Sequence, residues 1–373
     1  MRYNNVYLDC LAYSLPEETI TTYQLEQMLA PLYERLKLPY GRLELMTGIT
    51  ERRIWPKGEL PGDRSVETVG KLLTRTGIPR EKIGAFIHAS VCRDYQEPAT
   101  ACDVHRRLGL PQTCMVHDLS NACLGLLSGL IQIANMIELG QIEAGIVAGT
   151  ETSRALMEST ITLLNTNLSI TRKSVKPAFA SLTIGSGSAA ILLTNKVLSQ
   201  TGNRLLGGAV TADTTHSALC RSQVDVTAGG RSSGQLMETD SEALLHAGVG
   251  AAERNFASFL SELQWTSDTI DRTFCHQVGK AHEKLLFERL GLNMEKNFMT
   301  FSLLGNTGSV ALPTAAAIGI DSGFARPGER IALLGIGSGI NVVMLGIDWK
   351  ATIPAEPGDS TILARFMEMN AKG

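Results

Sequence analysis

The sequence predicts an α/β fold made of two similar halves. Short β-rich runs alternate with segments of helix length along the chain, which is the pattern of strands and helices packed in layers. Two distant segments also follow the same plan, which indicates an internal duplication. With 373 residues, of which 44% are apolar and 19% charged, the chain is long enough for two domains and can bury a substantial core.

The expected strands are short apolar runs bounded by polar or turn-forming residues. They cover residues 83–90, 115–118, 144–148, 189–193, 298–303 and 331–334. The expected helices are longer segments, which cover 65–76, 123–139, 241–263, 280–290 and 309–322. This alternation of strands and helices is typical of an α/β fold.

The duplication is seen in LSNACLGLLSGLIQIANMIELGQIEAGIVAGTE and LLGNTGSVALPTAAAIGIDSGFARPGERIALLGIGS. Each segment runs from a strand end through an Asn-containing turn, a helix of small residues and a buried strand to a glycine turn. The distance from Asn121 to Gly149 is 28 positions, and that from Asn306 to Gly335 is 29. This near-match in spacing indicates two related structural halves.

The boundaries of the halves follow from the repeat. We expect an N-terminal half over residues 1–195, a C-terminal half over 205–350 and a C-terminal tail over 351–373. The segment 152–180 is rich in Thr, Ser, Asn and basic residues. It is interpreted as a cap or binding segment inserted in the first half, because such polar stretches usually lie outside the core.

Charge and cysteine usage argue against several classes of protein. The 34 basic and 37 acidic residues give a net charge of -3, so no global field favours nucleic acid or an anionic membrane. The seven cysteines form no CxxC pair, which disfavours a disulfide framework or a zinc cluster, and we expect no metal site. The most apolar stretches are too short or too interrupted to span a bilayer, and no signal peptide is recognised at the N-terminus. We expect a soluble cytoplasmic protein.

Cys123 is the first candidate for chemistry. It lies in the segment SNACLGLL, after an expected strand and at the start of an apolar helix. The positive end of a helix favours the thiolate, which is the nucleophilic form of cysteine, so we expect this thiol to ionise more easily. The alternative is a buried packing cysteine.

His276 and Asn306 are the second and third candidates, and both lie at strand-to-helix transitions of the second half. Active sites in α/β sheets gather beyond the carboxyl ends of the strands, so these residues and Cys123 could converge on one cavity. Taken separately, the histidine could be a packing residue and the asparagine a turn residue.

Several motifs resemble the Cys-His-Asn condensing enzymes of the thiolase superfamily, specifically the β-ketoacyl-acyl-carrier-protein synthase III branch. They are, in chain order, GITERR at 48–53, NACLG with Cys123, HQVGKAH with His276, GNTGSVALP with Asn306, and ALLGIGSGIN near the C-terminus. The resemblance implies a five-layered αβαβα thiolase fold of two similar halves, normally a homodimer. It implies no metal or redox cofactor, only thioesters of CoA or of an acyl carrier protein.

The resemblance also implies a role for each motif residue. Cys123 would take an acyl group from a thioester, with the oxyanion held by its own N–H and that of Ser338 between Gly337 and Gly339. Preorganised hydrogen-bond donors at a developing oxyanion make a large contribution to the rate of such reactions. Glycines let the backbone approach a ligand closely. His276 and Asn306 would donate hydrogen bonds to the thioester oxygen of a second substrate and stabilise its enolate.

Glu97 bears on the identity of that second substrate. Malonyl-using relatives commonly carry an aromatic residue before the proline, whereas the run RDYQEPAT here is similar to that of the olefin-biosynthesis acyl-CoA condensing enzymes. In those enzymes this glutamate, contributed across the dimer interface, is the base that removes an α-proton. A carboxylate in an apolar pocket has a raised pKa and accepts protons better near neutral pH. The alternative is an ordinary glutamate in a surface or interface salt bridge.

Arg52, Arg53 and Trp55 resemble the family's entrance region, which meets the CoA nucleotide or the phosphopantetheine arm. Guanidinium groups suit phosphate geometry, so a substrate-binding role is expected. A solvated charge run is the alternative.

Three functions remain open at this point. The first is a homodimeric acyltransferase that condenses two fatty acyl-CoA molecules without decarboxylation and yields a long-chain 2-alkyl-3-keto acid after hydrolysis. The second is a synthase III that condenses acyl-CoA with malonyl-acyl-carrier protein by decarboxylation. The third is a catalytically idle subunit, which the intact Cys-His-Asn set disfavours.

Overall fold

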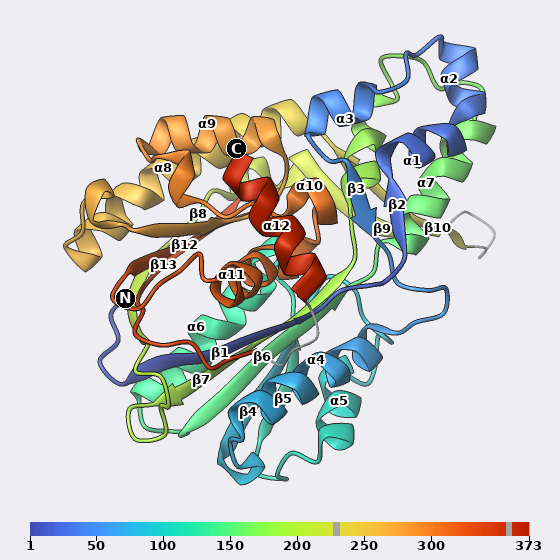
Figure 1. Ribbon diagram of the computed structural model, residues 1–373. Helices are drawn as coiled ribbons and strands as arrows, with labels where there is room; N and C mark the ends of the chain where they lie inside the picture. Colours follow the sequence, from blue (N-terminus) through green and yellow to red (C-terminus); the bar gives the residue numbers. More distant parts are fainter. Residues whose placement is uncertain (227–231, 356–359, 373) are drawn as a thin grey trace.

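The computed structural model describes residues 1–226, 232–355 and 360–372, and its central feature is a mixed β-sheet (Figure 1). Within these residues the sheet has nine strands in the order β11-β12-β13-β8-β1-β7-β6-β4-β5. The strands are β1 (Val6–Ser14), β4 (Ile83–Ala89), β5 (Met115–Leu119), β6 (Ala144–Glu151), β7 (Gly187–Asn195), β8 (Arg204–Ala212), β11 (Arg272–Cys275), β12 (Arg330–Gly337) and β13 (Asn341–Asp348).

The two ends of this sheet repeat one pairing pattern. In the first half β4 pairs parallel with β6, β6 antiparallel with β7, and β7 antiparallel with β1. In the second half β11 pairs parallel with β12, β12 antiparallel with β13, and β13 antiparallel with β8. In the sheet, the halves meet at β1 and β8, where Tyr7 and Arg204 form an antiparallel pair.

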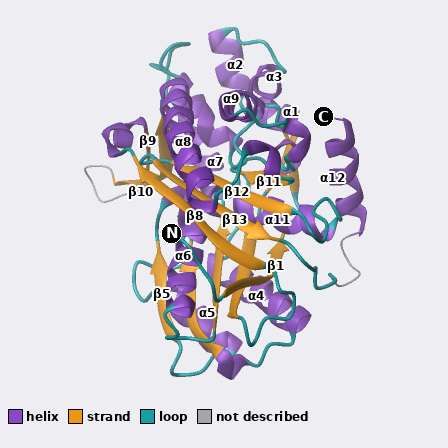
Figure 2. Cartoon of the chain, turned by 90° about the vertical axis from the view of Figure 1, so that its left-hand side faces the viewer, coloured by secondary structure: helices purple, strands orange, loops and turns teal. Residues whose placement is uncertain are grey.

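Helices cover both halves and also lie between them (Figures 1 and 2). The outer face of the first half carries α4 (Pro61–Thr76) and α5 (Thr100–Leu108), and that of the second carries α8 (Ser241–Leu263) and α9 (Lys280–Leu290). Between the halves lie α6 (Gly125–Glu138) and α11 (Ala311–Asp321). This is the αβαβα order of layers that the sequence predicts.

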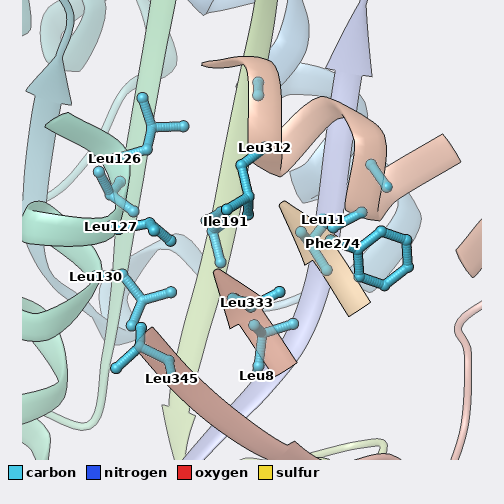
Figure 3. Close-up of a cluster of buried hydrophobic side chains, with 14 of the residues drawn as sticks. Leu8, Leu11, Leu126, Leu127, Leu130, Ile191, Phe274, Leu312, Leu333 and Leu345 are labelled. Atoms are coloured by element: carbon cyan, nitrogen blue, oxygen red, sulfur yellow. The ribbon is translucent and has the colours of Figure 1, made fainter. Parts of the chain in front are cut away.

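The middle layer holds the main core of the molecule (Figure 3). Leucines of α6 and α11 pack between side chains from the strands of both halves, and full burial of each leucine stabilises the fold by about 1.5–3 kcal/mol. The labelled residues of this cluster are Leu8, Leu11, Leu126, Leu127, Leu130, Ile191, Phe274, Leu312, Leu333 and Leu345. This shared core joins the two halves into one unit.

A smaller apolar cluster lies beyond the sheet, around α1 to α3 and α7 (Figure 1). Within the segment 152–180, α7 (Arg154–Thr166) buries Leu156, Met157 and Leu164. The remaining elements of this region are β2 (Thr19–Thr21), α1 (Thr22–Met28), α2 (Ala30–Leu36), α3 (Arg42–Thr47), β3 (Glu51–Arg53), η3 (Lys176–Thr183), β9 (Cys220–Val226) and β10 (Ser232–Thr239).

The short 3-10 turns η1 (Arg80–Lys82), η4 (Thr214–Leu219), η5 (Ser267–Thr269) and η6 (Met294–Lys296) join other elements.

The expected strand over 298–303 is wrong, because its second part forms the short helix α10 (Phe301–Leu304). The backbone N–H groups of Thr300 and Phe301 donate to Oε1 of Gln277 at 2.8 and 3.2 Å. Since a side chain satisfies these donors, they need no neighbouring strand.

The tail at 351–373 contains a helix, α12 (Ser360–Lys372), while residues 356–359 and 373 lie outside the described part of the chain. Phe366 of α12 is fully buried in the main core. Asn370 exchanges hydrogen bonds with the backbone N–H and C=O of Met299 at 2.7 and 3.1 Å. Among the described residues, no helix is both long and apolar enough to cross a membrane.

Candidate active site

A cavity of about 540 Å³ opens where the two halves meet the smaller apolar cluster. Cys123, His276 and Asn306 all line it, so the structure brings the three candidates together. Most of the remaining wall is apolar and includes Leu43, Met46, Leu156, Phe179, Leu244, Leu245, Ile336 and Ile340. A largely apolar chamber with a few polar groups suits a lipid-like substrate.

Cys123 lies in the turn η2 (Ala122–Leu124) between β5 and α6. Ala122 has a φ of 44°, which is uncommon for a residue other than glycine and marks a tight turn. Asn121 holds this turn, because its Nδ2 donates to Ser128 and its Oδ1 accepts from Nδ2 of Asn341 at 3.0 Å. The nucleophile turn is therefore tied to the loop that follows β12.

The environment of Cys123 disfavours the thiolate. Burial, with a contribution from the negative charge of Glu151, raises the pKa of Cys123 to about 12. The expectation of a more acidic thiol is thus wrong, because burial is the largest contribution to the pKa of Cys123 and raises it. The free protein carries a neutral thiol, whose proton must leave as the acyl group arrives.

His276 follows β11 and is 5% exposed. Its backbone N–H donates to the carbonyl of Leu334 at 3.1 Å, which fixes its position beside β12. Nδ1 has no hydrogen-bond partner among the described residues. Burial and the neighbouring His282 lower the pKa of His276 to about 3. The imidazole is therefore neutral, with one N–H to donate and one nitrogen that can accept a proton.

Asn306 is held by its backbone and by one side-chain atom. Its N–H donates to the carbonyl of Thr183 at 2.9 Å, and its Oδ1 accepts from the N–H of Gly308 at 3.0 Å. These bonds orient the amide and leave the Nδ2 donors without an intramolecular acceptor among the described residues. The side chain can therefore donate to a ligand in the cavity.

Ser338 lines the cavity in the turn between β12 and β13. A Cβ added to Gly337 would lie 3.0 Å from Cγ of Leu124, so the turn packs directly on the residue after Cys123. Gly339 has a φ of 133°, and a Cβ there would lie 2.7 Å from Nδ2 of Asn341. Gly339 therefore needs glycine, and the absence of a side chain at Gly337 lets the turn pack closely on the segment that contains Cys123.

Glu97 lies elsewhere in this chain. It is exposed in the loop between β4 and α5, and it is absent from the cavity wall of the described chain. Val91 and Cys92, at the start of the same loop, do line the cavity. The loop thus begins at the site of its own chain and presents Glu97 outward.

Arg52, Arg53 and Trp55 also lie outside the cavity wall. Arg52 is 1% exposed and donates to Oγ1 of Thr22 at 3.0 Å. Trp55 is buried, with the guanidinium of Arg64 at 5.0 Å over its ring, and Arg53 donates to the carbonyl of Pro16 at 2.6 Å. Arg52 and Trp55 are packed inside the protein, which is contrary to the expected role at the entrance.

Glu151 and His282 also line the cavity, and sequence reasoning gave a role to neither. His282 follows His276 by six residues, and burial lowers its pKa to about 4. Glu151 could have been noticed as an acidic residue that ends a buried strand. No group of three or more His, Cys, Asp or Glu side chains in the described chain is arranged to hold a metal ion.

A buried carboxyl group lies behind His276. Glu283 of α9 is 3% exposed, and its Oε1 accepts from Nδ2 of Asn297, which also contacts the sulfur of Cys275. Its Oε2 has no hydrogen-bond partner within the described residues. Burial raises the pKa of Glu283 to about 7.

Replacing Glu283 with glutamine is expected to change the pH dependence of stability. The unfolded chain loses this proton near pH 4.5, whereas the folded protein keeps it to about pH 7, so folding stability falls as the pH rises through this window. The variant lacks this pH-dependent loss of folding stability, which amounts to about 3 kcal/mol in the wild type. Urea unfolding at pH 5 and pH 8 measures the difference, with the exposed Glu253→Gln as control. An equal pH dependence in wild type and Glu283→Gln would contradict it.

Two family models match the chain. The N-terminal domain of thiolase matches residues 60–201, and the C-terminal part of 3-oxoacyl-[acyl-carrier-protein] synthase III matches residues 260–349. The first region contains Cys123, and the second contains His276 and Asn306.

Full-length relatives are similar to the chain. An acyl-CoA:acyl-CoA alkyltransferase of Shewanella oneidensis is 41% identical over 352 residues, and one of Xanthomonas campestris is 32% identical over 349 residues. Each alignment covers 94% of this chain and 100% of the relative. A β-ketoacyl-[acyl-carrier-protein] synthase III of Neisseria meningitidis is 25% identical and covers 79% of this chain and 85% of the relative.

Two solved structures are also similar to this chain. A crystal structure of Xanthomonas campestris OleA matches with a TM-score of 0.88 at 32% identity, covering 94% of this chain and 98% of that one. Another, with bound lauric acid and lauroyl-CoA, matches with a TM-score of 0.87 at 31% identity, covering 93% and 100%.

Proposed function

Because this chain belongs to the acyl-CoA:acyl-CoA alkyltransferase family of the thiolase superfamily, we propose that it joins two fatty acyl-CoA molecules by a Claisen condensation without decarboxylation. The family and the thiolase fold are those that the sequence motifs predict. The product is a long-chain 2-alkyl-3-keto acid, released after hydrolysis of its thioester. The observation that carries the proposal is the convergence of Cys123, His276 and Asn306 on one largely apolar cavity.

The first step is acyl transfer to Cys123. The thiol proton has to pass to the departing CoA sulfur, and His276, whose Nδ1 has no hydrogen-bond partner among the described residues, lies in the same cavity and can relay it. The developing oxyanion accepts hydrogen bonds from the N–H groups of Cys123 and Ser338; the close packing of Gly337 on Leu124, the residue after Cys123, supports this assignment. Free CoA leaves and carries the proton on its sulfur.

The second step forms the carbon-carbon bond. Glu97 removes an α-proton from the second acyl-CoA, and the resulting enolate oxygen accepts hydrogen bonds from His276 and Asn306. The enolate carbon attacks the acyl-Cys123 carbonyl, and the sulfur of Cys123 leaves as a thiolate that takes back the proton removed by Glu97. The product is a 2-alkyl-3-ketoacyl-CoA, and water then cleaves its thioester to the acid and CoA. Every step uses only the two thioesters, water and residues of the protein.

We place Glu97 at the site of a second subunit in a homodimer. Its side chain is exposed on its own chain, and the neighbouring Val91 and Tyr95 are 44% and 60% exposed. Next to this loop lies β5, the edge strand of the sheet, on which Met115 is also exposed. An open strand edge flanked by apolar side chains is suited to pairing with another copy of the chain.

Purified protein given one long-chain acyl-CoA alone is expected to release CoA and form a β-keto acid, or the ketone left by its decarboxylation. The physical reason is that removal of an α-proton by Glu97 makes a malonyl donor unnecessary. Mass spectrometry of the products, with and without malonyl-acyl-carrier protein, makes the measurement. Product only in the presence of the malonyl donor would mean a synthase III reaction. An absence of any acyl adduct on Cys123 would favour an idle subunit.

A further inference from the structure

Glu151 is a buried acidic residue for which the proposed steps give no role. It is the last residue of β6, is 4% exposed and lines the cavity that contains Cys123. A carboxyl group in such a place costs free energy unless hydrogen bonds satisfy it. Its hydrogen-bond partners therefore indicate what it does.

The carboxyl group accepts hydrogen bonds from two separate loops, and both of its oxygens take part. The N–H of Val91 donates to Oε1 at 3.0 Å, and the N–H of Cys92 donates to Oε2 at 3.2 Å. From the other side, Ser309 donates to Oε1 through its N–H at 3.3 Å and its hydroxyl at 2.5 Å. Glu151 thus joins the loop that leads to Glu97 with the turn η7 (Gly308–Val310) that follows Asn306.

The surrounding packing leaves this link little freedom. A Cβ added to Gly308 would lie 3.2 Å from Cγ of Glu151, and Gly308 has a φ of 57°. The sulfur of Cys92 accepts from the N–H of Thr152 at 3.4 Å, which attaches the same loop to the end of β6 a second time. The hydroxyl of Ser309 also lies 3.2 Å from the carbonyl of Ala89, at the end of β4.

We propose that Glu151 is a positioning residue for the condensation step. Its carboxyl group fixes the loop bearing Glu97 and the turn after Asn306 relative to one another. This inference rests on the proposed function. The base that removes the α-proton and the donor that receives the enolate charge need a defined geometry, and an error of about 1 Å can cost about a hundredfold in rate. Acyl transfer to Cys123 depends on neither group.

Acyl transfer to Cys123 gives a second readout. Burial raises the pKa of Glu151, and the hydrogen bonds from Ser309, Val91 and Cys92 oppose this shift. None of these hydrogen bonds involves Cys123, so loss of the carboxyl group should spare the thiol, whereas general damage to the site would slow both steps. The condensation step alone should respond.

Glu151→Gln is the variant that tests the inference. Glutamine keeps the shape of the side chain, but its NH₂ group must face either the N–H of Cys92 or the N–H groups of Val91 and Ser309, so at least one donor loses its acceptor. We expect condensation of acyl-CoA to slow by about 10- to 100-fold. Acylation of Cys123, followed by mass spectrometry, and its alkylation by iodoacetamide at pH 8 should be no slower than in wild type.

Glu143→Gln is the matched control. Glu143 lies just before the same strand, β6, but its carboxylate pairs with Lys82 on the surface, where ion pairs contribute little. It should leave both steps unchanged. If Glu151→Gln condenses at the wild-type rate, or loses acylation and condensation equally, the inference is overturned.

If Glu151→Gln folds poorly, Ser309→Ala tests the same inference. It removes one donor from Glu151 and is expected to slow condensation severalfold while acylation persists; equal loss of both steps would refute the link. Failure of the proposed function is seen separately, because wild-type protein would then make no product from acyl-CoA alone.

Discussion

Replacing Cys123 with alanine is expected to abolish condensation. The variant has no nucleophile to carry the first acyl group, so product formation should fall by roughly three or more orders of magnitude. The cavity stays otherwise intact, since the change removes one sulfur atom from its wall. CoA release and intact-protein mass spectrometry after incubation with a long-chain acyl-CoA measure both the rate and the acyl adduct.

Cys220→Ala is the control for this experiment, because Cys220 lines the same cavity and its sulfur accepts a hydrogen bond from Thr239, at 3.4 Å. It should still acquire one acyl group on Cys123 and form product. If Cys123→Ala protein released a stoichiometric burst of CoA and became acylated at another residue, the assignment of the nucleophile would be wrong.

Replacing Glu97 with glutamine is expected to stop the second step and spare the first. Glutamine cannot remove the α-proton, and loss of a general base slows a reaction by about 10²- to 10⁴-fold. Since Glu97 lies outside the cavity of its own chain, acyl transfer to Cys123 should proceed and the acyl-enzyme should accumulate. Glu81→Gln, an exposed change just before β4, is the matched control and should leave both steps intact.

Mixed dimers decide whether Glu97 acts across the interface. When Glu97→Gln and Cys123→Ala chains are mixed and allowed to exchange, half of the dimers contain one of each. One site of such a dimer then combines an intact Cys123 with the intact Glu97 of the other chain, so about a quarter of wild-type activity should return. A base that acts within its own chain would restore none.

The sequence alone predicts the fold class and three residues of the site. Cys123 and His276 follow the strands β5 and β11, and the ends of such strands lie at one edge of a layered sheet. Asn306 lines the same cavity, but it follows the helix α10. The helices at 241–263 and 280–290 are found with those bounds, because their apolar pattern and length mark them without tertiary information.

Properties that depend on neighbours from distant parts of the chain were decided by the tertiary structure. The strand expected at 298–303 gives way to α10, because Gln277 satisfies its backbone donors. The thiol of Cys123 is less acidic than its place in the sequence suggests, because burial outweighs the nearby helix end.

Glu151 shows most directly that the sequence does not reveal contacts between distant segments. The sequence presents it only as an acidic residue at the end of a strand, and its partners lie 60 and 158 positions away. Local patterns carry the information for helices, strands and short motifs, since those depend on residues a few positions apart. Hydrogen-bond partners, burial and pKa depend on which distant segments the fold packs together, and these determined how the site of this protein is held.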